Sequence, residues 1–164
     1  MRIRWAFLAA AAVALAGCSS DAAKPREIGS ADAYVAIVNW EVGQLGPPAT
    51  NSALPVVYVA SEDGTAIGAG AQASVVQATV DTAKVRFTDV RDDAIDKDID
   101  GAPVKDSGVL LIVAKVDGKG KARIDVPVIV YRSEDDQQAT TLTLVATTGG
   151  ALVTSASTST PPSG

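Results

Sequence analysis

The chain has 164 residues, with 14 basic and 19 acidic side chains, one cysteine and no histidine. The lack of histidine excludes a Ser-His-Asp triad, a Cys-His dyad and a zinc site built on histidine, and a single cysteine excludes an internal disulfide. The formal net charge of −5 argues against nucleic acid as a partner, because an acidic surface repels the phosphate backbone.

Residues 1–18, MRIRWAFLAAAAVALAGC, have the pattern of a leader for export. Two arginines open the segment, an unbroken apolar run extends from Trp5 to Ala16, and small residues precede Cys18. The apolar run is too short for a permanent membrane-spanning helix, which needs about 20 residues. The pattern therefore predicts a secretory signal peptide over residues 1–17 that is cleaved before Cys18.

The four residues Leu15-Ala16-Gly17-Cys18 resemble the lipobox of bacterial lipoproteins. The resemblance implies that Cys18 receives a diacylglyceryl thioether, becomes the mature N-terminus and is held, acylated, at the outer face of the cell membrane. The whole chain, rich in alanine and valine, is also similar to the small lipoproteins of high-GC Gram-positive bacteria, a likeness that implies no particular activity.

The remaining chain divides into a tether, one domain and a tail. Residues 18–29 are small and polar, which predicts a lipidated flexible tether, and residues 30–156 are expected to form a single globular domain. Residues 157–164 are rich in serine, threonine and proline and predict a disordered tail, a candidate for O-glycosylation. Cleavage would leave 12 basic and 19 acidic residues, so membrane attachment is expected to rest on the lipid.

The first half of the domain reads as helices alternating with strands. Residues 30–42 predict a helix with Ser30 as N-cap, and a buried strand is the alternative. The proposed buried face of this helix consists of Tyr34, Ile37, Val38 and Glu41. The further expected elements are a strand over 55–60, a helix over 72–81, a strand over 84–88 and a short helix over 89–95.

The second half predicts an antiparallel meander. Its expected strands cover 109–116, 122–132, 140–147 and 151–155, with a hairpin turn at 117–120. Alternation places Ile124, Val126, Val128 and Val130 on one buried face. We therefore predict the α+β class, an antiparallel sheet with one or two helices packed on one face, and leave an all-β sandwich as the alternative.

Of all segments in the sequence, the one from Asp89 to Gly101 most resembles a functional site. Asp96, Asp98 and Asp100, followed by Gly101, match the start of a calcium loop. The twelfth position is Ser107 instead of glutamate, the eighth is Pro103, and Asp106 lies one residue too early. We therefore expect a solvated acidic loop and assign no metal site.

Three further sets of side chains have both a functional interpretation and a purely structural one. Glycosidase chemistry would use carboxylate pairs such as Asp92/Asp93 or Glu134/Asp135/Asp136, but these lie in charge-dense turns where raised pKa values are hard to arrange. The aromatic side chains of Tyr34 and Trp40 line a pocket or, as we favour, pack in the core. The basic residues Lys115, Lys119, Lys121 and Arg123 form a local anion patch or are simply solvated.

The sequence favours a lipid-anchored, non-catalytic binding or structural domain of the cell envelope, with no cofactor. Its partner is expected to be an envelope protein that the sequence does not identify. The alternative is a carrier of an apolar ligand, with a cavity between helix and sheet lined by Val128, Val130, Leu142 and Leu144. A hydrolase is the least favoured interpretation.

Overall fold

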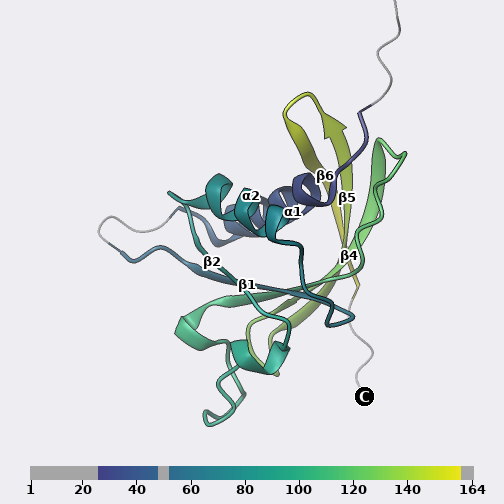
Figure 1. Cartoon of the computed structure of the whole chain (residues 1–164). Coiled ribbons are helices and arrows are strands. Elements are labelled where there is room, and N and C mark those ends of the chain that lie inside the picture. Colours follow the sequence, from purple (N-terminus) through teal and green to yellow (C-terminus); the bar gives the residue numbers. More distant parts are fainter. Residues whose placement is uncertain (1–25, 48–51, 160–164) are drawn as a thin grey trace, which may run out of the picture.

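The computed structural model describes residues 26–47 and 52–159. Six strands form one open sheet in the order β2-β1-β3-β4-β5-β6, with two helices on one face (Figure 1). The elements are α1 (Ser30–Leu45), β1 (Val56–Ser61), α2 (Ala69–Thr79), β2 (Lys84–Phe87), the 3-10 turns η1 (Arg91–Ala94) and η2 (Lys105–Ser107), β3 (Val109–Val113), β4 (Arg123–Tyr131), β5 (Gln137–Thr147) and β6 (Gly150–Ser159). The predicted α+β class is confirmed, and the sandwich alternative is wrong because there is a single sheet.

Strand β1 is parallel to both of its neighbours, β2 and β3. Parallel strands need a crossover connection, and the chain makes two of them. Helix α2 joins β1 to β2 on one face, and residues 88–108 join β2 to β3 and pack on the other. We call β1, β2, β3 and these two connections the parallel unit.

The predicted meander is confirmed. Strands β3, β4, β5 and β6 pair antiparallel in chain order, and β4, β5 and β6 are called the meander below. Burial alternates along β4, and the four predicted inward residues are at most 7% exposed. Register slips are opposed because a shift of one residue would bury Asp125 in their place.

Helix α1 buries the predicted face, including Tyr34, and the strand alternative is wrong. Its N-cap is Gly29 rather than Ser30, and no side chain caps the end. The helix also continues through Gly43 and stops at Gly46, whose φ of 76° favours glycine. Helix α2 begins at Ala69, three residues earlier than predicted.

The sheet is covered on both faces where it is parallel. The larger core cluster lies between the two helices and the sheet, and it includes the inward residues of the meander. A smaller cluster lies behind β1 and β3, where Ala94 and Val104 are 0% and 3% exposed. The segment predicted as a solvated acidic loop therefore also covers the sheet: most of its carboxylates are exposed, while Ala94 and Ile95 pack in the smaller cluster.

The folded part extends beyond the predicted domain at both ends. Ile28, assigned to the tether, is 2% exposed, and its amide donates to the Lys121 carbonyl at 3.0 Å. Strand β6 runs to Ser159, past the predicted start of the tail at residue 157, because its backbone pairs with β5 regardless of the small polar side chains. The signal peptide, Cys18 and residues 160–164 lie outside the described residues. None of the described helices has the length and apolar character needed to cross a membrane.

Candidate ligand-binding site

A polar hollow lies where β1 and β3 end. In open sheets, ligands bind beyond the carboxyl ends of parallel strands, where neighbouring connections leave in different directions. Here the chain leaves β1 toward α2 and leaves β3 toward β4. The hollow has a volume of about 240 Å³. Its lining consists of Ser30, Tyr34, Ser61, Asp63, Thr65, Ala66, Ile67, Gly68, Ala71, Lys115 and Val116.

Asp63 is the fixed anion of this hollow. The Ser61 hydroxyl donates to Asp63 Oδ1 at 2.6 Å, and the backbone amide of Thr65 donates to the same oxygen at 2.9 Å. The Ser61 hydrogen bond, with those from Thr65, lowers the pKa of Asp63 to about 2. The carboxylate is thus ionised and oriented at any physiological pH.

Tyr34 supplies a neutral donor to the same hollow. The residue as a whole is 7% exposed, and its hydroxyl, which no residue in the described part of the chain pairs, reaches the solvent of the hollow. Burial, and then the charge of Asp63, raise the pKa of Tyr34, so the hydroxyl keeps its proton. The exposed Lys115 also lines the hollow, so the hollow offers a carboxylate, a hydroxyl and a cation.

The three aspartates of the calcium-like motif are not brought together. They lie in a small hairpin closed by the Ile95–Val104 bridge and by the Asp96 amide donating to the Pro103 carbonyl at 2.8 Å. Asp98 and Asp100 are exposed. Within residues 26–47 and 52–159, no three acidic side chains are arranged to hold a metal ion.

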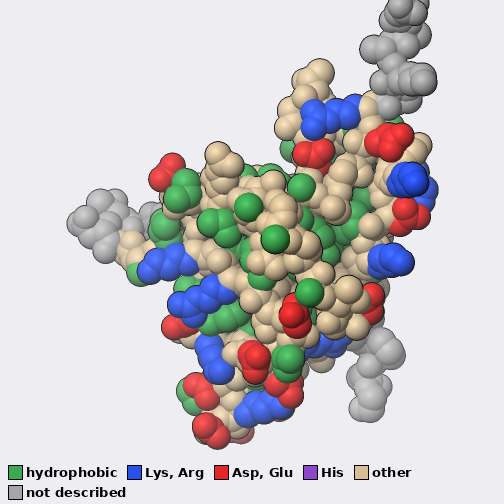
Figure 2. Space-filling view, viewed as in Figure 1, with side chains coloured by type: hydrophobic (Ala, Val, Ile, Leu, Met, Phe, Trp, Pro, Cys, Tyr) green, Lys and Arg blue, Asp and Glu red, His purple; other side chains and the backbone are tan. Residues whose placement is uncertain are grey.

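The carboxylate pairs also stay on the surface. Asp92 forms an ion pair with Lys97, and Asp136 lies 3.8 Å from Arg132. Figure 2 shows acidic and basic side chains interspersed at the lower end of the molecule. Because these carboxylates are solvated and have basic neighbours, their environment lacks the burial that acid catalysis needs.

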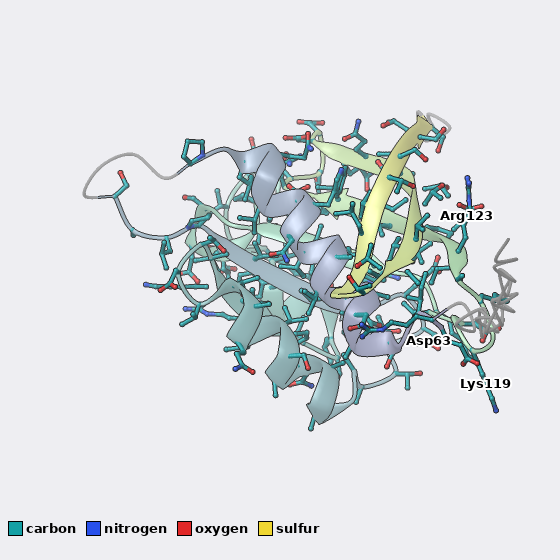
Figure 3. All side chains as sticks on the ribbon, turned by 90° about the horizontal axis from the view of Figure 1, so that it is seen from above. Asp63, Lys119 and Arg123 are labelled. Carbon is teal, nitrogen blue, oxygen red and sulfur yellow. The ribbon has the colours of Figure 1, made fainter. Side chains whose placement is uncertain are left out.

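Three of the four basic residues near the β3–β4 connection, Lys115, Lys121 and Arg123, line one open hollow together with Asp117 and Asp125. Figure 3 shows Lys119 and Arg123 projecting outward in different directions, and Asp63 lies apart from both, near the foot of α1. Lys121 lies 3.4 Å from the Asp117 carboxylate. All four side chains are exposed, and of the four only Lys115 also lines the polar hollow beyond β1 and β3.

Tyr34 and Trp40 pack on the core and also line hollows, but they line different ones. Tyr34 belongs to the polar hollow, whereas Trp40 lines a second hollow of about 200 Å³ between α1 and β6. Each of the two residues therefore packs on the core and also lines a hollow that is a candidate ligand site.

The sequence analysis did not identify one cluster of ionised and hydroxyl side chains, because its members lie far apart in the chain. The Tyr58 hydroxyl donates to Asp106 at 2.8 Å, and Arg86 Nη1 donates to that hydroxyl at 2.7 Å and to Asp106 at 2.5 Å. The Tyr58 hydrogen bond is the first cause that lowers the pKa of Asp106. Asp106 and Ser107 have φ of 57° and 50°, a strained conformation that this cluster holds in place.

A second ion pair joins α1 to the end of β4. Arg132 Nη2 lies 2.6 Å from Glu41 Oε1, and Glu41 is 1% exposed. Burial raises the pKa of Glu41, and the Arg132 guanidinium opposes that rise. Because a buried carboxylate needs its counter-ion, we interpret this pair as structural.

Compared with protein-family models, curated proteins and solved structures, the chain has no significant match in any of the three.

Proposed function

We propose that the chain is a lipoprotein, anchored through Cys18 at the outer face of the cell membrane, whose domain binds a small polar ligand in the polar hollow beyond the ends of β1 and β3. The observation that carries the binding proposal is that the Tyr34 hydroxyl, which no described residue pairs, and the fixed Asp63 carboxylate line the same hollow. The hydroxyl faces the solvent of the hollow, so a ligand that enters can accept its hydrogen bond in place of water.

The chemistry of the hollow defines the ligand class. Asp63 accepts hydrogen bonds or faces an ammonium, while Tyr34 and Lys115 donate. A small molecule that carries both donor and acceptor groups matches this set. We propose binding without catalysis, because a carboxylate that stays ionised down to about pH 2 is a poor proton carrier near neutral pH.

The apolar carrier fits the structure less well. The four residues that would line its cavity are at most 1% exposed and belong to the packed core cluster. The polar hollow, in contrast, is open to solvent on the surface of the domain and needs no rearrangement for entry.

The anchor is tested by acylation. The parent chain should incorporate a labelled fatty acid, and Cys18→Ala should incorporate none. Globomycin, which blocks the lipoprotein signal peptidase, should make the lipid-modified precursor accumulate. Unchanged membrane partitioning of Cys18→Ala would contradict the anchor.

The binding site is tested on protein purified from its native membrane, then denatured, with the released small molecules identified by mass spectrometry. A polar molecule should leave the parent, and much less of it should leave Tyr34→Phe or Asp63→Asn. Tyr58→Phe is the matched control, because it also removes one tyrosine hydroxyl, but outside the hollow. Equal release from the parent and from both hollow variants would contradict the site.

A further inference from the structure

The two helices bring N-terminal ends of different charge to the polar hollow. Helix α1 begins at Ser30, which lines the hollow, and its first turn has an acid of its own, Asp32, paired with Arg26 at 3.2 Å. Helix α2 begins after Gly68, which also lines the hollow, and the described residues of its first turn include no capping side chain and no acid. A helix N-terminus carries a partial positive charge that favours anions. Of the two ends, that of α2 is the one left uncompensated.

The first backbone amides of α2 have room for an acceptor. Ala71 and Gln72 donate to the Gly68 carbonyl at 2.9 and 3.1 Å, while the amides of Ala69 and Gly70 have no acceptor in the part of the chain that the structure describes. A Cβ built on Gly68 or Gly70 would meet no atom within 4 Å, so small side chains leave the backbone of this turn open. Free amides at a helix N-terminus are a ready site for an anionic group.

The hollow also contains polar groups that lack partners. Asp63 receives two hydrogen bonds, both at Oδ1, whereas an ionised carboxylate has about four acceptor sites. Within residues 26–47 and 52–159, no lysine or arginine forms an ion pair with Asp63. The hydroxyl of Tyr34, a residue that is 7% exposed, lines the same hollow with no described partner. A fixed negative charge and an uncompensated positive helix end therefore border one small space.

We propose that the polar hollow binds a free α-amino acid. The carboxylate of the ligand accepts hydrogen bonds from the first amides of α2, with Lys115 and the Tyr34 hydroxyl as further donors. Its ammonium faces Asp63. A phosphate would match the end of α2 but not Asp63, because the fixed carboxylate repels it. The inference deepens the proposed binding function and rests on it: it states which polar molecule the hollow takes.

The size and the apolar wall of the hollow restrict the side chain of the ligand. The volume of about 240 Å³ lies below the ~300–1,000 Å³ of pockets for drug-sized molecules. The apolar part of the wall consists of Ala66, Ile67, Ala71 and Val116. We therefore expect alanine or valine to bind more tightly than charged or aromatic amino acids.

The test is isothermal titration of the whole chain, dialysed in detergent micelles, with each of the common protein amino acids. Saturable heat is expected with alanine or valine. The amino acid that binds is then compared with its N-acetyl derivative, which lacks the ammonium, and with its amide, which lacks the carboxylate. Each derivative should bind about tenfold more weakly or worse, because it loses hydrogen bonds made by a charged group.

Two variants locate the two charges. Gly68→Asp supplies the missing N-cap of α2, so it should be at least as stable as the parent, yet it should weaken the amino acid about tenfold or more and not weaken the amide derivative. Asp63→Asn should weaken the amino acid and not the N-acetyl derivative. The control is Gln77→Glu, which adds a negative charge to α2 about two turns further along and outside the hollow. It should bind as the parent does, since the effect of the helix end is confined to the first turn.

Three results would overturn the proposal. The first is a lack of saturable binding by every amino acid titrated. The second is a derivative without one of the charges that binds as tightly as the amino acid itself. The third is affinity that Gly68→Asp leaves unchanged. If protein from the native membrane releases a polar molecule that lacks either charge, and Tyr34→Phe reduces its release, the amino acid is wrong while the proposed polar site stands.

Discussion

The parallel unit and the meander share one sheet, but their strands are buried differently. All five residues of β3 and five of six in β1 are buried, because helices cover one face and residues 88–108 cover the other. In β4 burial alternates, so one face packs on α1 and the other meets solvent. Burial on both faces requires long connections, and long connections bring polar side chains to the ends of the strands.

That difference places the candidate site. The loops after β1 and β3 supply Asp63 and Lys115, while the meander contributes no residue to the polar hollow. We infer that the meander is the stable scaffold of the domain and that the parallel unit carries the ligand site.

A charge in the buried face of the meander is expected to have the largest effect. Val128 is 1% exposed, so Val128→Asp should prevent stable folding, and Val128→Ala should cost about 1–3 kcal/mol. Urea unfolding of a chain that starts at Ser19 measures both. On the opposite face, Asp125→Ala loses one hydrogen bond from Thr143 and should cost no more than about 1 kcal/mol. Equal tolerance of Val128→Asp and Asp125→Ala would refute the assigned facing.

Removal of the counter-ion of Glu41 is expected to have the second largest effect on stability. Arg132→Met should cost about 3–5 kcal/mol at neutral pH, because a buried carboxylate loses its partner. Burial raises the pKa of Glu41 above its ordinary 4.5, so the folded state holds the proton more tightly than the unfolded chain. The loss of unfolding free energy in Arg132→Met is therefore small below pH 4.5, where Glu41 is protonated in both states. It grows as the pH rises through the pKa of Glu41 in the folded state.

The double variant Glu41→Gln/Arg132→Met is the control for this pair. It leaves no buried charge, so its stability should lie well above that of Arg132→Met at neutral pH. An Arg132→Met loss that is the same at every pH would show that the carboxylate is not its cause.

A close backbone contact ties the start of the domain to the β3–β4 connection. A Cβ on Gly118 would lie 2.1 Å from the carbonyl oxygen of Ile28, so Gly118→Ala should displace Ile28 and cost about 1.5–3 kcal/mol of burial. Gly43→Ala, with nothing within 4 Å of the added atom in mid-helix, should stabilise by about 0.5–1 kcal/mol. A stabilising Gly118→Ala would be inconsistent with this contact.

The smallest expected effect is confined to the surroundings of the Tyr58–Arg86–Asp106 cluster. Tyr58→Phe removes the hydroxyl that joins Arg86 to Asp106 and should loosen residues 88–108 without affecting the meander. Hydrogen exchange should quicken at the Val104 amide, which donates to the Arg132 carbonyl, while amides of β5 stay as protected as in the parent. Faster exchange across the whole sheet would mean that this cluster stabilises the entire sheet and not residues 88–108 alone.

The meander was predictable because its residues alternate over whole strands. Ile124 to Val130 and Leu142 to Leu144 show which face is buried without any knowledge of partners. The parallel unit had a signal as well: a strand, a helix and a strand within residues 55–88 have the length of a β-α-β unit, about 30 residues. That pattern favours parallel pairing, which the predicted antiparallel sheet did not include.

The candidate site was less accessible to sequence reasoning. Asp63 reads as an ordinary turn residue, because its role comes from Ser61 and from a helix that precedes it by some twenty residues in the chain. The aspartates at 96, 98 and 100 have the spacing of a calcium loop, yet Asp98 and Asp100 are exposed, Asp96 is half-buried, and the three do not converge on a metal site. Pairs such as Tyr58 with Asp106 are set by strand order, which a single sequence does not encode locally.

Native-state hydrogen exchange under increasing denaturant tests the division between scaffold and site most directly. The account predicts that amides of β4 and β5 exchange only through global unfolding, while β2 and residues 88–108 open at a lower free energy. One common opening free energy for all six strands, or higher protection in β2 than in β4, would contradict it.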